Sequence, residues 1–473
     1  MAKELSPEQK IIHTLNRTTF GPRADEIREA KRVGIESYLN QQLRPETISD
    51  ALVEDKLAHL KTLRLTSRDL YELYPPPKQA AGSPAMESSS MQGPRFVIFE
   101  LQRARLLRAV YSKRQLFETM VDFWTNHFNI FAAKGADRWL VTSYDRDTIR
   151  PHTLARFRDL LLATAQSPAM LFYLDNWLSV GRDLAPQSPL LRANANRKTG
   201  LNENYARELL ELHTLGVDAG YTQRDVEEVA RCFTGWTIRR PRGEAVFYFE
   251  PRVHDSGEKM VLGTRIPAGG GMEDGVKVID LLARHPATAR FVSAKLARRF
   301  VADDPPSSLV AHLAEVFRQS DGDIRAVLHA LFTSPEFFSP EAYRSKVKKP
   351  LEFVTSALRI LDVETDASLA LMRVLAGMGE PLFLALPPTG FPDVGASWVS
   401  ADGLLARINF VSDLASNRIT GTQVRVAPAG EMSSLIPLVA PEGLSPSTRA
   451  AVSEVDAPQN YAVLLAAPEF QRR

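Results

Sequence analysis

The sequence predicts a predominantly α protein, a multi-helix globular assembly that contains one small β-hairpin. Apolar residues recur at intervals of three and four through most of the chain, which is the spacing of an amphipathic helix. Helix-start signals precede several of these segments, and only one stretch has the residue pattern of strands. A composition of 44% hydrophobic and 24% charged residues is ordinary for a globular protein of 473 residues.

Helix signals follow one another from the N-terminus. Ser6 and Pro7 have the residue types of an N-cap and a first helical position, and Gly21 follows the end of the same segment. A stretch rich in Pro, Gly and Ser at 75–94 predicts a mobile loop. From Phe96 to Phe131 the apolar spacing predicts a pair of helices in the centre of the core.

The strand signal lies at about 245–263. Two runs rich in β-forming residues flank Asp255, Ser256 and Gly257, which are typical of turns. We therefore expect one β-hairpin inserted into the helical assembly, with its turn at these three residues. Helical spacing resumes at Gly275 and continues through most of the remaining chain.

Charge and cysteine content exclude several classes of protein. The 58 basic and 56 acidic residues give a net charge of +2, which favours neither nucleic acid nor anionic lipid, so we expect no nucleic-acid partner. The lysine-rich segment at 344–350 and the arginine-rich helix at 101–115 are interpreted as solvated faces. The single cysteine, Cys232, excludes an internal disulfide framework and a cysteine–zinc site.

No segment has the pattern of a membrane anchor or a leader. The apolar runs fall short of the ~18 to 20 residues that a membrane helix requires, and none follows the lysine near the N-terminus. We therefore expect a cytoplasmic protein with no transmembrane segment. The alternative is a periplasmic or exported protein from which a leader was removed.

The strongest candidate site is the helix predicted from Asn204 to Gly216. Successive helical residues turn by ~100°, so one side of this helix carries polar groups. They are Asn204, Arg207, Glu208 and Glu211. Two carboxylates in adjacent turns repel each other unless a cation or a proton lies between them. This side is therefore either a reaction site or a solvated face on which Arg207 pairs with Glu211.

A second predicted helix brings more charge to the same region. Thr222 and Asp225 have the spacing of a capping box, and the short turn before them makes the two helices antiparallel neighbours. Arg231 on the second helix then lies near the first. His254 and Lys259 on the predicted hairpin are interpreted either as turn residues or as charged groups delivered to a pocket.

Asn126 and His127 lie in a segment dominated by aromatic residues, FWTNHFNIF. A histidine in such surroundings is either a core residue with satisfied hydrogen bonds or a base or metal ligand that aromatic packing holds in place. The sequence contains no H-E-x-x-H, G-x-S-x-G, P-loop or dinucleotide-binding motif, so several common enzyme classes are excluded.

These motifs together resemble a bacterial family known as domain of unknown function 1800. They are NENYARELLELHTLG, TQRDVEEVARCFTGW, FWTNHF and HDSGEKMVLG, and the similarity extends over nearly the whole chain. The resemblance implies one α-rich unit over residues 1–473. Members are commonly exported, and their genes often neighbour those of a sulfatase- or phosphatase-like family. This implies a place in the cell envelope and such a protein as partner, although the export leader of many members is missing from this sequence.

The signature positions of the family are mostly polar here, whereas positions kept for packing would be mostly apolar. They are His127, Asn202, Glu203, Asn204, Arg207, Glu208, Glu211, Arg231, Gly235, Trp236, His254, Lys259 and Trp398.

Two functions agree with these residues. In the first, an enzyme acts on an anionic or polar polymer by metal-assisted hydrolysis or by acid–base chemistry. Its catalytic residues are His127, Glu208, Glu211 and His254. Its substrate contacts are Asn126, Asn204, Arg207, Arg231, Lys259 and Trp236. The ligands of a divalent metal ion are then Glu208, Glu211 and His127. In the second, a non-catalytic binding or assembly protein uses the same residues as a structural salt-bridge network.

Overall fold

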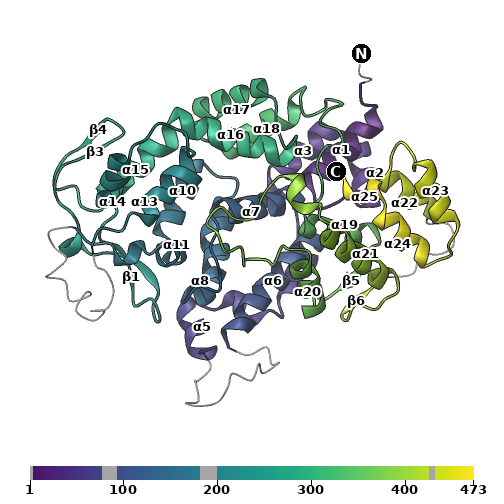
Figure 1. Cartoon of the computed structure of the whole chain (residues 1–473), viewed down its shortest axis with the longest axis horizontal. Helices are drawn as coiled ribbons and strands as arrows, with labels where there is room; N and C mark the ends of the chain where they lie inside the picture. Colours follow the sequence, from purple (N-terminus) through teal and green to yellow (C-terminus); the bar gives the residue numbers. More distant parts are fainter. Residues whose placement is uncertain (1–3, 77–92, 182–199, 425–431) are drawn as a thin grey trace.

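The computed structural model of the protein describes residues 4–76, 93–181, 200–424 and 432–473. Its architecture is predominantly α, which confirms the predicted fold class (Figure 1). The predicted mobile loop at 75–94 lies almost entirely outside the described residues. Within the part of the chain that is described, no helix is long and apolar enough to cross a membrane.

The helices divide about equally between the two halves of the chain. The first half contains α1 (Pro7–Thr18), α2 (Ala24–Val33), α3 (Ile35–Gln42), α4 (Ala51–Leu57), α5 (Ser67–Leu73), α6 (Pro94–Tyr111), α7 (Gln115–His127), α8 (Asp137–Ser143), α9 (Arg150–His152), α10 (Phe157–Gln166), α11 (Pro168–Tyr173), α13 (Asn204–Glu208) and α14 (Gln223–Cys232). Two π-helical turns, η3 (Tyr144–Ile149) and η6 (Leu209–Thr214), continue α8 and α13. The second half contains α15 (Glu273–Arg284), α16 (Pro286–Phe300), α17 (Ser307–Gln319), α18 (Ile324–Thr333), α19 (Pro350–Ile360), α20 (Leu369–Gly377), α21 (Ala401–Ala415), α22 (Met432–Val439), α23 (Pro446–Ser453), α24 (Gln459–Ala466) and α25 (Pro468–Gln471).

Local signals in the sequence set two of the predicted helix starts. Ser6 caps α1, with Pro7 in its first turn. Thr222 and Asp225 form the predicted capping box of α14, in which each side chain accepts from the backbone amide of the other, at 3.2 and 2.9 Å. The predicted central helix pair is α6 and α7, and Trp124 on α7 is fully buried.

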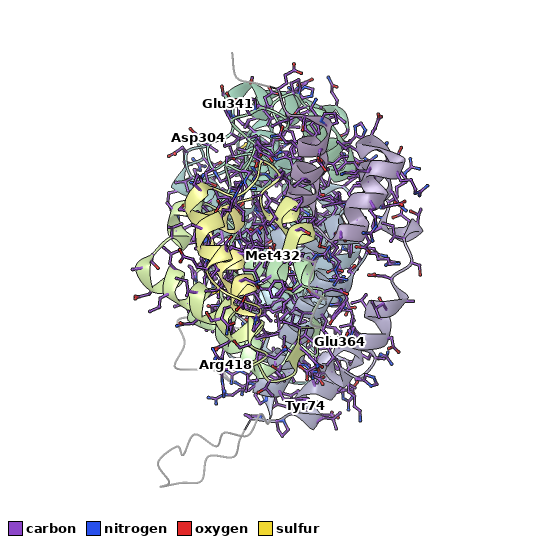
Figure 2. All side chains as sticks on the ribbon, turned by 90° about the vertical axis from the view of Figure 1, so that its right-hand side faces the viewer. Tyr74, Asp304, Glu341, Glu364, Arg418 and Met432 are labelled. Atoms are coloured by element: carbon purple, nitrogen blue, oxygen red, sulfur yellow. The ribbon has the colours of Figure 1, made fainter. Side chains whose placement is uncertain are left out.

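The helices enclose two large hydrophobic cores. One core is built mainly by α7, α8, α10, α11 and α13–α18, and the other mainly by α6, α19–α21 and α24. Figure 1 shows α10–α15 at the left, α21–α24 at the right and α7 between them. A smaller cluster joins α1, α2 and α3, and Leu438 of α22 packs against it. The C-terminal helices thus lie beside the N-terminal ones, as Figure 2 shows from the side.

The strands form two hairpins where the sequence predicts one. β1 (Trp236–Arg239) pairs with β2 (Val246–Phe249), and β3 (Lys259–Val261) pairs with β4 (Thr264–Ile266), both antiparallel. The prediction of a single turn at residues 255–257 was therefore wrong. The second hairpin turns at Leu262 and Gly263, whose φ values of 47° and 75° suit a two-residue turn. A third sheet contains only β5 (Glu364–Thr365) and β6 (Thr422–Gln423).

Candidate functional site

The Asn-Glu-Asn segment at residues 202–204 lies at the start of α13. Its asparagines form hydrogen bonds that connect this helix to the turn after α11. The Asn202 side chain donates to the Asp175 carbonyl at 3.0 Å and accepts from the Asn204 amide at 2.9 Å. The Asn204 side chain donates to the Leu174 carbonyl at 3.3 Å. The polar side of α13 is therefore held close to residues 174 and 175.

Arg207 neutralises two of the acids on this helix but not the third. Its guanidinium lies 3.4 Å from the Glu203 carboxylate and 3.7 Å from that of Glu211. It also donates to the Gln223 side chain at 2.9 Å, which joins α13 to α14. Glu208 forms no hydrogen bond and no ion pair with any residue that the structure describes.

The protonation of Glu208 follows from these surroundings. Burial raises the pKa of its carboxyl group, the negative charge of Glu211 raises it further, and Arg207 opposes both. The side chain is half-buried, so it still reaches the surface of the protein. A carboxyl group that keeps its proton to higher pH is suited to proton transfer near neutral pH.

Tyr173, the last residue of α11, lies close enough to Glu208 for their charges to interact. Burial and the charges of Asp137 and Glu208 raise the pKa of Tyr173 to about 12. Lys134 donates to the Asp175 carboxylate at 3.0 Å and to the Tyr173 carbonyl. Asp175 has a φ of 58°, in the left-handed region that non-glycine residues rarely adopt. Such a conformation is more frequent at functional sites.

Asp137 is a fully buried acid. Neither of its carboxylate oxygens has a hydrogen bond within the described residues. Burial raises the pKa of Asp137 well above its ordinary value, while Lys134 lowers it and Asp175 raises it. The Asp137 carboxyl group therefore keeps its proton to higher pH than an ordinary aspartate does. No sequence motif marks Lys134, Asp137, Tyr173 or Asp175, because they precede the signature block by many residues.

Arg231 and Lys259 belong to a separate ionic network. Arg231 lies 2.8 Å from both Glu228 and Asp255, and it links α14 to the segment before β3. Lys259 is buried, and its ammonium lies 2.6 Å from Asp274. Each of these cations has a close acidic partner, and Lys259 and Asp274 are both buried. Such ion pairs are typical of a structural network.

Two other predicted site residues lie in or beside this network. The His254 ring is buried between the Thr234 carbonyl, at 2.8 Å, and Asp274, at 3.3 Å. Trp236 is fully buried and packs edge-on against Phe233 and Phe247, with ring centres 5.0 and 5.2 Å apart. No described hydrogen bond or ion pair joins His254 or Trp236 to Glu208.

His127 occupies an aromatic environment, as the core interpretation predicts. Its ring lies 4.5 Å from that of Phe128 and 5.4 Å from that of Trp124. Its Nε2 lies 3.1 Å from the His213 carbonyl, and burial lowers the pKa of His127 well below its ordinary value. His127 has no contact with Glu208 through the described hydrogen bonds or ion pairs.

The predicted metal ligands do not assemble into a site. Glu208 and Glu211 share one helix face, whereas the His127 ring is packed among aromatic side chains. Across the described ranges, no group of three or more His, Cys, Asp or Glu side chains is placed to hold a metal ion. The use of a divalent ion by this protein stays a prediction.

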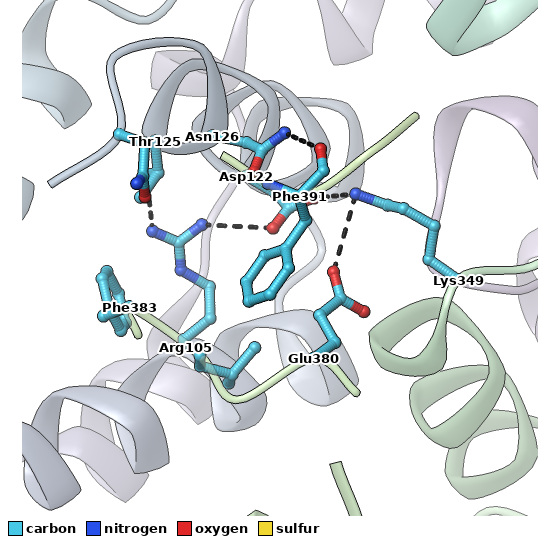
Figure 3. A pocket seen from close by; sticks show the side chains of 10 residues that line it. Arg105, Asp122, Thr125, Asn126, Lys349, Glu380, Phe383 and Phe391 are labelled. Atoms are coloured by element: carbon cyan, nitrogen blue, oxygen red, sulfur yellow. Dashed lines mark hydrogen bonds and ion pairs between the residues drawn. The ribbon is translucent and has the colours of Figure 1, made fainter. Parts of the chain in front are cut away.

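Asn126, which precedes His127 on α7, lines a small cavity (Figure 3). Its side chain exchanges two hydrogen bonds with the backbone of Phe391, at 2.8 and 2.7 Å. The cavity has a volume of about 30 Å³, enough for a water molecule. Its charged lining residues are Arg105, Asp122, Lys349 and Glu380.

The burial of several basic side chains corrects the interpretation of the two basic segments. Lys346, Lys348 and Lys349 are buried rather than solvated, and so is Arg105 of the arginine-rich helix. Lys349 lies 3.5 Å from Asp122, with which it joins α7 to the start of α19. A lysine pattern alone predicts exposure, because lysines are rarely buried without a partner.

The fold and these residues define a helical protein with a half-buried acid on the polar face of α13 that has no ion-pair partner among the described residues. A family model described as "Protein of unknown function (DUF1800)" matches residues 13–472. The chain therefore belongs to this family, which confirms the resemblance seen in the sequence motifs. No curated protein and no solved structure matches the chain.

Proposed function

We propose that the protein is an enzyme that hydrolyses a polar polymer by general acid–base catalysis, with Glu208 as the proton-transferring group. The supporting observation is the asymmetry among the acids of α13 and η6. Arg207 pairs with Glu203 and Glu211, whereas Glu208 has no partner among the described residues. Its raised pKa keeps a proton available for a leaving group.

The local charge favours a neutral substrate over an anionic one. Among the described residues, the charged acids nearby are Glu203, Glu211 and Asp175, and the cations nearby are Arg207 and Lys134. An excess of carboxylates repels an anionic polymer. A hydroxyl-rich chain such as a neutral polysaccharide offers hydroxyl groups to the carboxylates, and its bridging oxygen accepts a proton from Glu208. Glu208 then takes a proton back from the attacking water molecule.

The experiment compares Glu208→Gln with Glu203→Gln, a matched change on the same helix. Purified protein is tested on a panel of neutral and anionic polysaccharides, and new reducing ends are measured. We expect hydrolysis of a neutral polymer, with kcat at least ~100-fold lower in Glu208→Gln and within a few-fold of wild type in Glu203→Gln. Equal losses in both variants, or hydrolysis of anionic polymers alone, would contradict the proposal.

The non-catalytic alternative is favoured for the other polar cluster. Arg231 and Lys259 each have close acidic partners, so we propose that they fix the positions of α14, β3 and α15 rather than bind substrate. A place in the cell envelope and a sulfatase- or phosphatase-like partner, both implied by the family, also stay proposals.

A further inference from the structure

The small cavity beside Asn126 is lined by charges of both signs (Figure 3). Arg105 on α6 and Lys349 before α19 bring two cations to its wall, and Asp122 on α7 and Glu380 after α20 bring two acids. Arg105, Lys349 and Glu380 are only 4%, 6% and 2% exposed. Groups from four parts of the chain therefore line one space of about 30 Å³.

The ion pairs that line this cavity are longer than the ~2.7–3.2 Å of an ordinary N–H···O hydrogen bond. Asp122 lies 3.5 Å from Lys349 and 3.8 Å from Arg105, and Lys349 lies 3.7 Å from Glu380. The pair of Arg105 with Asp145, which does not line the cavity, is shorter at 2.8 Å. Neither the Lys349 ammonium nor the Asp122 carboxylate has a polar partner closer than 3.5 Å among the described residues. Both groups therefore keep hydrogen-bonding capacity for a molecule in the cavity.

The two signs of charge select the chemistry of that molecule. An anionic group in the cavity would be repelled by Asp122, and an ammonium group would be repelled by Arg105 and Lys349. An apolar group would leave the charged groups without hydrogen bonds. A hydroxyl group is both a donor and an acceptor, so it can donate to Asp122 and accept from Lys349 at the same time. The cavity is therefore suited to a neutral hydroxyl group.

The cavity reaches the surface beside α7. Asp122, Asn126 and Phe391 are half-buried, whereas Arg105, Lys349 and Glu380 are buried. Asn126 is one of the substrate contacts that the sequence predicts, and its hydrogen bonds to the Phe391 backbone join the two sides of this opening. The remaining wall is apolar and includes Leu382 and Phe383. A ligand that carries carbon–hydrogen groups beside a hydroxyl group matches such a lining.

We propose that this cavity binds a hydroxyl group of a neutral polyol or sugar, which donates to the Asp122 carboxylate and accepts from the Lys349 ammonium. One water molecule requires ~10–15 Å³, so the cavity of about 30 Å³ has room for the hydroxyl group and its carbon atom. The rest of the ligand lies toward Asn126 and Phe391. The inference does not rest on the hydrolysis proposed for Glu208, because it concerns binding at other residues.

Methyl NMR of the full-length protein tests this site without a variant. Glycerol, cellotetraose, glycerate and 3-amino-1,2-propanediol are titrated separately, and the shifts of the Leu382 methyl groups are measured. Leu405, which is 57% exposed on α21, is the control. We expect saturable shifts of Leu382 alone with the two neutral ligands, with a Kd for glycerol on the order of 10 mM and at least ~10-fold weaker binding of the two charged ligands.

The same titrations identify the source of the hydroxyl group. Binding of cellotetraose at least ~10-fold tighter than glycerol supports a polysaccharide, and equal or weaker binding supports a free polyol. Binding of a charged ligand as tightly as glycerol overturns the proposal. The absence of a saturable Leu382 shift with both neutral ligands also overturns it, because the cavity would then hold ordered water only.

An Asp122→Asn variant tests the acceptor of the hydroxyl group, and Glu352→Gln is the matched control. Both changes remove one negative charge from the same ion cluster, but Glu352 does not line the cavity. We expect glycerol to bind at least ~5-fold more weakly to Asp122→Asn and within ~2-fold of wild type to Glu352→Gln. Circular dichroism verifies that each variant is folded. Unchanged affinity in folded Asp122→Asn overturns the role of Asp122, and the titrations of the wild-type protein decide the proposal if that variant does not fold.

Discussion

Glu208 and Glu380 are acids with raised pKa values, but their surroundings assign them different roles. Glu208 is half-buried and has no hydrogen bond or ion pair among the described residues. Glu380 is buried, accepts from the Leu351 amide at 2.7 Å and lies 3.7 Å from the Lys349 ammonium. Burial and the charge of Asp122 raise the pKa of Glu380 to about 7 although Lys349 opposes them. Glu380 therefore connects helices, whereas Glu208 makes no such connection among the described residues.

The charges around Glu380 join elements of the two large cores. Arg299 on α16 lies 2.6 Å from Glu352 on α19 and 3.6 Å from Asp122 on α7. Arg473 lies 2.9 Å from Glu352 as well. Because these charges are removed from water, each depends on its partners to offset the free energy of desolvation. The acids on α13 remain near water and depend on Arg207 much less.

The largest change in the free energy of unfolding is expected from Arg299→Met, among the buried charges around Glu380. Arg299 is 1% exposed, and its removal leaves buried carboxylates with fewer cations. We expect the free energy of unfolding to fall by about 3–5 kcal/mol, measured by urea denaturation. Arg318→Met is the control, because Arg318 has an acidic partner too but is 55% exposed, and such pairs contribute at most ~1 kcal/mol. Similar losses in the two variants would show that the buried ion pairs of Arg299 contribute no more to stability than the exposed pair of Arg318.

A smaller effect of opposite sign is expected from Glu380→Gln. The pKa of Glu380 is 4.5 ordinarily and about 7 in the folded protein, so the folded state binds the proton more tightly. The contribution of Glu380 to the free energy of unfolding is therefore fully present below pH 4.5 and is lost as the pH rises through 7. At pH 8 the variant should be more stable than wild type by about 3 kcal/mol, and at pH 5 by less than ~1 kcal/mol.

Glu352→Gln provides the matched control for this prediction. Arg473 and Arg299 lower the pKa of Glu352 despite its burial, so the same chemical change there removes a stabilising charge. We expect Glu352→Gln to destabilise the protein at pH 8. Stabilisation by both variants, or destabilisation by both, would contradict the opposite roles assigned to Glu352 and Glu380.

Local signals account for what the sequence predicts correctly about the fold. The helices, the capped start of α14 and the polar side of α13 depend on residues a few positions apart. The single predicted hairpin differs from the two observed ones because strands of three or four residues are too short to show a clear alternation of apolar and polar residues. The pairing of Trp236–Arg239 with Val246–Phe249 depends on tertiary packing, since Trp236 is buried in the first core.

The composition of the sites depends on contacts between distant residues, which a sequence pattern does not show. Lys349 contacts Asp122 across 227 positions, and this contact makes the lysine a buried residue. Likewise, the pairing of Arg207 with Glu203 and Glu211 distinguishes Glu208 from its neighbours. A helical wheel places Arg207, Glu208 and Glu211 on one side of the helix but does not say which acid lacks a partner among the described residues.

The smallest effect is expected from Arg207→Gln. Arg207 lowers the pKa of Glu208, so its removal raises that pKa. Hydrolysis that requires protonated Glu208 would then persist to higher pH, and the alkaline limb of kcat/KM should move upward by less than ~1 pH unit. The stability should fall by no more than ~1 kcal/mol, because Arg207 is 39% exposed. Arg224→Gln, at an exposed position on α14, should leave the limb in place. An upward shift of the acidic limb instead of the alkaline limb would show that Glu208 acts as an ionised group. A loss of several kcal/mol would make the α13 face a structural network like that around Glu380.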